Sequence, residues 1–247
     1  MSQHPFLEKN KFLLGSFASN CSSGMTISTL PERWDASWEN NLKLAELLDD
    51  AGIDFMLPIA RFTGYGGETD FQGSILETVT WTSALLARTK QLVVFATIQT
   101  AVNHPVVVAK QIATMSKISD NRVGLNIVAG WNKPEYEALG LTLPDDHETR
   151  YGYAQEWYDL VKKVWQSETA FDFEGKYFQT KGTYGKPHRR RHQRHRIRTD
   201  GAALRPLRRG HPQESVRPAG QGREAHRCHR KGNDAGIRAG TVIKYYL

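Results

Sequence analysis

Four short apolar runs, each followed by a stretch with helical spacing, restrict the fold of this chain more than any other feature. Each run is rich in β-branched and other apolar residues, as in a strand buried on both faces. In the stretches that follow, apolar residues recur three and four positions apart, which is typical of one face of a helix. Strands alternating with helices predict an α/β fold of parallel strands joined by right-handed crossovers. The predicted strands span residues 11–19, 54–60, 91–98 and 123–128, and the predicted helices residues 37–52, 75–89, 106–119 and 148–166.

The ends of the first predicted helix and of the second predicted strand carry recognisable stop signals. Gly52 follows the helix and suits a C-terminal cap, because glycine adopts a left-handed backbone without strain. Pro58 has no N–H to donate, so we expect the second strand to stop there. The predicted buried face of the helix carries four apolar residues: Leu44, Leu47, Leu48 and Ala51.

The fourth predicted strand runs into a loop that is rich in chemically active side chains. Inside the strand, Asn126 lies between apolar neighbours, and a buried amide without hydrogen-bond partners costs about 1–3 kcal/mol. Beyond Gly130, the sequence WNKPEYE adds an aromatic ring, an amide, charges and a rigid turn. Ligands in α/β folds bind at the C-terminal ends of the strands. The stretch therefore predicts a ligand site, and a core strand followed by an ordinary Pro-containing loop is the alternative.

Charge divides the chain into two chemically different parts near Pro187. Residues 188–247 hold 16 of the 33 Lys and Arg but only 4 of the 26 Asp and Glu, for a net charge of +12. Residues 1–187 carry a net charge of −5. After a predicted hairpin over residues 170–180, the apolar periodicity ends and six of the nine histidines follow. We therefore predict a folded region over residues 1–187 and a disordered basic tail over residues 188–247.

Two interpretations of this tail stay open. The tail is rich in Arg, His, Gly, Pro and Ala, which is the composition that a GC-rich gene yields when it is read out of frame. One hypothesis is therefore a shifted reading frame beyond Pro187. The other is a basic arm, because any strongly cationic segment binds polyanions by releasing counterions. The tail has no recognisable nucleic-acid module, and its aromatic residues are limited to Tyr245 and Tyr246. A specific nucleic-acid partner is therefore not expected.

The two cysteines, Cys21 and Cys228, lie far apart and form no CxxC or Cys/His metal motif. This usage supports neither a disulfide framework nor a metal site, and it favours a reduced, cytoplasmic protein. The N-terminal residues lack the apolar core of a signal peptide, and no apolar run has the length of a membrane span. We expect no membrane association.

Five stretches, in their order along the chain, resemble the bacterial luciferase-like flavin-dependent monooxygenases. They are GIDFMLPIARFTGYGG, FATIQT with NHPVVVAKQIATM after it, NRVGLNIVAGWNKPEYEALG, DDHETRYGYAQEW and FEGKYF. The resemblance covers roughly three-quarters of the chain. Within the family, the sequence is most similar to the branch that contains pyrimidine, alkanesulfonate and dimethylsulfone monooxygenases. It implies a TIM (β/α)8 barrel, of which about the first four βα units are present here.

The resemblance also implies cofactors and partners. Members of the family take reduced FMN from a separate NAD(P)H flavin reductase, use O2 as co-substrate, and insert one oxygen atom into a small organic molecule. For this chain, a pyrimidine, a sulfonate or a sulfone-like compound is the expected substrate. Full-length relatives are expected to form homo-oligomers.

Residues that match the family's motifs receive expected roles. Thr97 and Asn126 are the expected catalytic residues, on the oxygen side of the flavin ring. Simpler explanations stay open, since Arg150 has acidic neighbours with which it can pair and Thr97 suits a core strand. The resemblance implies flavin contacts at six positions: Ile59, Ala60, Asn126, Glu135, Arg150 and Tyr151.

Four strands do not close an eight-stranded barrel, so we expect both edges of the sheet to lie open and the chain to fold poorly and lack most activity. Two alternative functions stay open. One is an inactive half-barrel whose tail binds polyanions, and the other is a deazaflavin-dependent oxidoreductase on the same fold.

Overall fold

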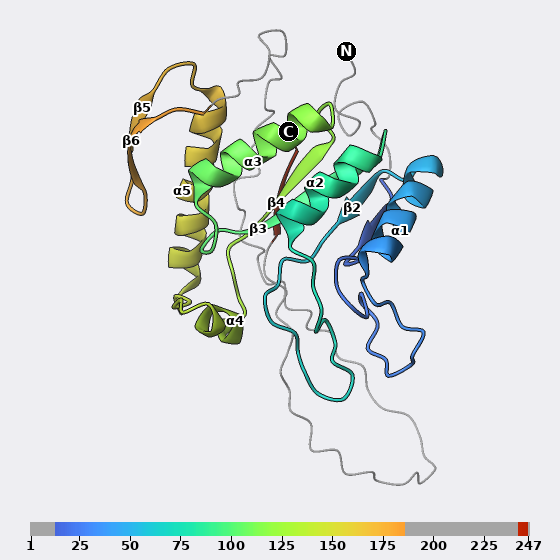
Figure 1. Cartoon of the computed structure of the whole chain (residues 1–247). Coiled ribbons are helices and arrows are strands. Elements are labelled where there is room, and N and C mark those ends of the chain that lie inside the picture. The colour runs from blue at the N-terminus through green and yellow to red at the C-terminus, as the bar shows by residue number, and fades with distance from the viewer. Residues whose placement is uncertain (1–12, 186–241, 247) are drawn as a thin grey trace, which may run out of the picture. The chain divides into compact units, whose positions relative to one another are not determined.

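The computed structural model of the chain describes residues 13–185 and 242–246 (Figure 1). Its main sheet has the order β1-β2-β3-β4-β7, and the first four strands are parallel. Each of these four strands lies within or closely matches a predicted one, so the α/β fold is confirmed. The strands are β1 (Gly15–Phe17), β2 (Phe55–Leu57), β3 (Val93–Gln99), β4 (Val123–Val128) and β7 (Val242–Tyr246).

Helices follow the four parallel strands, as the alternation predicts. Figure 1 shows α1, α2 and α3 lying side by side across one face of the sheet, with α5 packed beside α3. No helix in the described part of the chain has the length and apolar character that a bilayer crossing requires. The helices are α1 (Trp38–Asp50), α2 (Thr78–Arg88), α3 (Pro105–Ile118), α4 (Lys133–Ala138) and α5 (His147–Gln166).

The predicted hairpin is also present, as β5 (Phe171–Glu174) and β6 (Gln179–Thr183) paired antiparallel. The short helix α4 was not predicted, because six residues are too few to show a helical period. It lies in the chemically active loop after β4 and places Glu135 there.

The two faces of the sheet differ in chemistry because successive strand residues point to opposite sides. The face toward the helices is apolar and packs on residues such as Leu85 and Ile112 in one continuous core. Burying such side chains is the dominant stabilising term of the fold. The sheet residues of this face are Met56, Val94, Ala96, Ile98, Leu125 and Ile127.

The opposite face begins with an aromatic layer. Phe55 and Phe95 meet edge to face, with ring centroids 5.8 Å apart. Gly15 lies opposite Phe55 and Gly124 opposite Phe95 in the strand register. A Cβ atom on either glycine would lie only 2.5 Å from the neighbouring ring, so these positions must be glycine. Beyond this layer, towards the strand C-termini, the same face becomes polar.

The predicted buried face of α1 is right in part. Leu44 and Leu48 are partly buried and pack against the core, but Leu47 is 59% exposed and Ala51 is also exposed. The fully buried residues of the helix are Asn41, Ala45 and Asp49. Both polar residues are buried because they bond to neighbouring segments: the Asn41 Oδ1 accepts from Trp81 Nε1 at 2.9 Å, and Asp49 accepts three backbone N–H groups. Gly52, with a φ of +72°, does follow the helix as expected.

One of the two sheet edges is not open as predicted. The outer edge of β4 pairs antiparallel with β7, with Asn126 opposite Lys244 in the register. The tail was predicted to be disordered, yet five of its residues form this strand, which consists largely of β-branched and aromatic residues with high strand propensity. The remaining tail residues and the boundary at residue 187 lie outside the described residues.

Candidate functional site

The polar face of the sheet centres on a hydrogen-bonded pair from two adjacent strands. Thr97 of β3 and Asn126 of β4 are register partners, and each is only 4% exposed. Asn126 Nδ2 donates to Thr97 Oγ1 at 3.1 Å, and Thr97 Oγ1 donates to the Pro58 carbonyl oxygen at 2.6 Å. Because the Thr97 hydroxyl donates its one hydrogen to Pro58, it can only accept a hydrogen bond from Asn126. This fixes the Asn126 amide and turns its Oδ1 away from Thr97.

Gln99 forms a second polar link on the same face, two residues beyond Thr97. Its Nε2 donates to the Ala60 carbonyl oxygen at 3.1 Å and to Glu135 Oε2 at 2.9 Å. Both partners are acceptors only, so the amide orientation of Gln99 is also fixed. Glu135 Oε1 accepts from the Phe62 backbone N–H at 2.5 Å. Helix α4 is thereby joined to the ends of β2 and β3.

Backbone groups fix the end of β2. Ile59 donates its N–H to Asn20 Oδ1 and accepts from Asn20 Nδ2 at its carbonyl oxygen, both at 2.9 Å. Asn20 is fully buried, so water does not compete for these two hydrogen bonds. Ile59 and Ala60 are therefore held in place next to Thr97 and Gln99, as expected for adjacent strand ends.

The close approach of Tyr136 to Gly130 positions α4. Gly130 has a φ of +94°, and a Cβ atom there would overlap the Tyr136 hydroxyl. That hydroxyl donates to the Ala129 carbonyl oxygen at 3.3 Å. Burial raises the pKa of Tyr136, the Glu135 charge adds to this effect, and the Arg150 charge opposes it. The electrostatic influence of Arg150 therefore extends to the residue that anchors α4.

Arg150 and Tyr151 lie at the start of α5 and bond locally. Arg150 Nη1 donates to the carbonyl oxygens of Pro144 and Asp145, at 2.5 and 2.9 Å, and Tyr151 stacks on His147 with centroids 4.0 Å apart. Among the described residues, no hydrogen bond joins Arg150 to Thr97, Asn126 or Glu135. The predicted alternative for Arg150, an ion pair with a neighbouring acidic side chain, is also absent among the described residues, where Arg150 bonds to backbone carbonyl groups.

A cavity of about 210 Å³ opens beside these strand ends. Pockets that enclose a drug-sized ligand measure roughly 300–1,000 Å³, so this cavity alone is too small to enclose a ligand of that size. It is lined by Ala60, Arg61, Phe62, Gly73, Ile75, Leu76, Glu77, Thr78, Thr97, Gln99 and Asn103.

Several buried polar atoms of this region have no hydrogen-bond partner within the described part of the chain. Asn126 Oδ1 and Gln99 Oε1, on the polar face of the sheet, are acceptors without donors, and Arg61 Nε and Nη1, beside the cavity, are donors without acceptors. A buried polar atom of this kind needs a ligand or water as its partner. The ring system of a reduced flavin offers N–H donors on an otherwise flat apolar body, so the two amide oxygens of the sheet fit such a group.

Sequence reasoning missed three residues of the site. Gln99 had a detectable signal, because it lies two positions after Thr97 in a strand and so faces the same side. Arg61 follows Ala60 in a Gly-rich loop, and Asn20 was interpreted only as the end of the first strand. Neither loop position has a periodicity that would reveal its contacts. Within residues 13–185, no group of three metal-binding side chains comes together.

Comparison with known proteins gives a consistent result. The family model described as luciferase-like monooxygenase matches residues 13–209. Pyrimidine monooxygenase RutA of Bradyrhizobium sp. (strain BTAi1 / ATCC BAA-1182) is 34% identical over 175 residues, which cover 70% of this chain and 48% of that protein. The chain thus spans about half the length of the curated relatives it matches.

Solved structures share the fold. EDTA monooxygenase from Chelativorans sp. BNC1 superposes with a TM-score of 0.62 at 21% identity, covering 71% of this chain and 47% of that one. A riboflavin lyase crystallised with modified FMN and riboflavin gives a TM-score of 0.63 at 22% identity, covering 72% of this chain and 47% of that one. These similarities establish a shared α/β-barrel architecture for the described strand–helix units.

Proposed function

Because the chain belongs to the luciferase-like monooxygenase family, we propose that its strand ends form part of the active site of an FMN-dependent monooxygenase. The observation that carries this proposal is the pair of fixed acceptors, Asn126 Oδ1 and Gln99 Oε1, which are buried on one face without donors among the described residues. Two neighbouring acceptors of this kind suit the N–H edge of a reduced flavin.

Reduced FMN supplies two electrons to O2, so that one oxygen atom enters the substrate and the other leaves as water. The protein's own contribution is to hold fixed polar groups at the flavin edge and to exclude water. Thr97 and Asn126 would face the reacting edge. Ala60 would contribute backbone, and the Glu135 carboxylate would keep the loop after β2 in place through Phe62.

Arg150 and Tyr151 are proposed as further flavin contacts. The Arg150 Nε is buried without a partner among the described residues, which leaves one donor for a ribityl or phosphate oxygen. We also propose that a separate flavin reductase supplies reduced FMN, that the substrate is a small organic molecule, and that the protein works in the cytoplasm as part of a homo-oligomer.

Anaerobic titration with reduced FMN tests the proposal. We expect the chain to bind it, and Asn126→Leu to weaken binding by roughly tenfold or more, since the loss of a hydrogen bond to a ligand costs about 1–2 kcal/mol. Asn40→Leu, at an exposed position of α1, serves as the matched control and should bind FMN like the unchanged chain. Absence of binding, or equal affinities for all three proteins, would contradict the proposal. Titration with a deazaflavin tests the alternative cofactor.

A further inference from the structure

Arg61 forms no ion pair with the acidic side chains of the described residues. The residue follows the end of β2 and lines the cavity together with Thr97 and Gln99. Its Nε and Nη1 are buried and have no hydrogen-bond partner among the described residues. Burying unpaired donors of a cation is unfavourable, so the arrangement is stabilised when an acceptor enters the cavity.

Two carboxylates close to the cavity accept hydrogen bonds from other groups. Glu77 caps α2 by accepting from the backbone N–H groups of Val79 and Thr80, at 2.9 and 2.8 Å. Glu135 accepts from Phe62 and Gln99. The ion pairs among the described residues, Arg88–Glu46 and Lys162–Asp159, do not include Arg61. Within this part of the protein Arg61 is therefore available to bind an anionic ligand.

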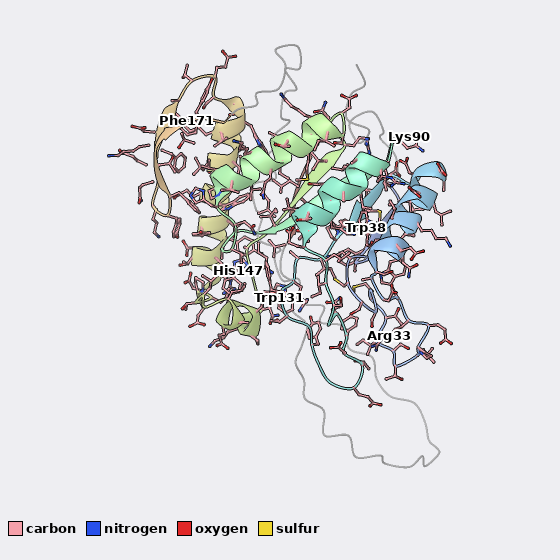
Figure 2. The ribbon with its side chains drawn as sticks, in the orientation of Figure 1. Arg33, Trp38, Lys90, Trp131, His147 and Phe171 are labelled. Carbon is pink, nitrogen blue, oxygen red and sulfur yellow. The ribbon has the colours of Figure 1, made fainter. Side chains whose placement is uncertain are left out.

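Two aromatic rings lie against the Arg61 guanidinium. Its central carbon lies 4.4 Å from the Tyr65 ring centroid and 5.5 Å from that of Trp131. Figure 2 shows Trp131 in the loop that leads from β4 towards α4. Aromatic faces that cover the flat side of a guanidinium leave its N–H edge free, and this edge matches two oxygens of a carboxylate or sulfonate.

The charge of Arg61 also affects a buried neighbour. Burial raises the pKa of the Cys21 thiol to about 12, and the Arg61 charge acts in the opposite direction. Arg61 is thus close enough to influence a second buried group electrostatically, as expected for a cation with no nearby anion to screen it.

We propose that Arg61 is a specificity-determining residue that binds the anionic group of the substrate, a small organic anion with a carboxylate or sulfonate. This inference rests on the proposed function and deepens it. A neutral pyrimidine or sulfone would leave the buried donors without a full counter-charge. The other source of an anionic group is the FMN phosphate. We assign Arg61 to the substrate because it lines the same cavity as Thr97 and Gln99, where the reacting edge of the flavin would lie.

Calorimetric titration with two probes of similar shape tests the proposal. Methanesulfonate carries one negative charge and dimethyl sulfone carries none. With the unchanged chain, in the presence and in the absence of FMN, we expect methanesulfonate to bind at least tenfold more tightly than dimethyl sulfone. Arg61→Gln should abolish this preference, and Arg61→Lys should retain part of it. Arg88→Gln, which removes an exposed arginine of α2, is the matched control and should keep the full preference.

Two further measurements separate the possible failures. Arg61→Gln should still unfold cooperatively, with its melting temperature lowered only by the loss of the contacts with the Tyr65 and Trp131 rings, and it should leave the affinities for FMN and riboflavin unchanged. Equal affinity for the two probes, or binding of neither, would overturn the assignment while FMN binding by the chain still supported the proposed function. Weaker binding of FMN but not of riboflavin by Arg61→Gln would assign the residue to the cofactor phosphate and overturn the proposal as well.

Discussion

Asn126 donates to Thr97, and Thr97 donates to Pro58, so one chain of two hydrogen bonds connects the C-terminal ends of three adjacent strands. The direction of these two hydrogen bonds matters more than their strength. Each donor has one acceptor that cannot reverse the bond, so the unpaired Asn126 oxygen has a fixed orientation before any ligand arrives. Preorganisation of this kind lowers the cost of ordering a site when it is used.

Replacement of Thr97 by valine tests whether these two hydrogen bonds orient Asn126. Valine keeps the shape but removes the hydroxyl, which leaves the Pro58 carbonyl and the Asn126 amide without partners. We expect the free energy of unfolding to fall by about 1–3 kcal/mol and reduced FMN to bind more weakly. Thr97→Ser keeps the hydroxyl and should retain most of both properties. Urea unfolding and FMN titration measure the two effects, and a Thr97→Val protein with unchanged FMN affinity would show that the hydroxyl does not orient Asn126.

The Gln99–Glu135 bond predicts a coupled pair. Glu135→Gln leaves one amide oxygen for two donors, the Phe62 N–H and Gln99 Nε2, so one of these bonds is lost unless Gln99 turns and gives up its bond to Ala60. We expect a loss of about 1–3 kcal/mol in the free energy of unfolding. In a Gln99→Met background the Phe62 N–H is the one remaining donor of this pair, and the new amide oxygen can accept it, so the same change should cost less.

A double-mutant cycle by denaturant unfolding measures this coupling. Glu137→Gln, at an exposed position of the same helix, is the control and should change stability little. Additive effects of Glu135→Gln and Gln99→Met would mean that the two side chains do not depend on each other.

The contact between Gly130 and Tyr136 predicts that Gly130→Ala and Gly140→Ala differ in their effects on stability and FMN affinity. Gly130→Ala introduces a Cβ atom that overlaps the Tyr136 hydroxyl, in addition to the strain of a φ of +94°. Gly140→Ala has a φ of +69° but nothing within 4 Å of the new atom, so only the backbone cost of about 1–2 kcal/mol applies. We expect Gly130→Ala to displace α4 and to weaken both stability and FMN affinity more than Gly140→Ala. Equal effects in thermal unfolding and FMN titration would exclude a positioning role for the Tyr136 contact.

The parts of the fold with strong apolar periodicity were predictable from the sequence. Strands β3 and β4 consist of residues that suit burial on both faces, and the α3 residues Val108, Ile112 and Met115 are buried as their spacing indicates. Pro58 also ends β2 as expected, because it cannot donate to the ladder. These features follow from local propensity and burial, which act within one segment.

The remaining features depend on partners that are distant in sequence. Asn41 and Asp49 face the core only because Trp81 and the Lys90–Leu92 backbone supply their hydrogen bonds. The apolar pattern therefore identified Leu44 and Leu48 of α1, which pack against the core, but missed these two buried polar residues. The unpaired donors of Arg61 depend in the same way on the packing of Tyr65 and Trp131 around its guanidinium, which no spacing in the sequence encodes.

Asp49 predicts how the stability of the chain depends on pH. Burial alone would raise its pKa, but the backbone N–H groups of Lys90, Gln91 and Leu92 and the charge of Arg122 outweigh this effect and hold the pKa of Asp49 below the usual value of 3.8. A carboxyl whose pKa is lower in the folded state stabilises the fold above its unfolded-state pKa, and this contribution is lost as the pH falls through the folded-state value. We therefore expect Asp49→Asn to lower the free energy of unfolding by about 1.5–3 kcal/mol at pH 7, since bonds to a charged acceptor are lost. The difference in this free energy between the variant and the unchanged chain should shrink as the pH falls below about 4.

Asp50→Asn, at the exposed neighbouring position, is the control. Urea unfolding from pH 7 to pH 2.5 provides the measurement, and a difference that stayed constant over this range would mean that the Asp49 charge does not stabilise the junction between α1 and β3.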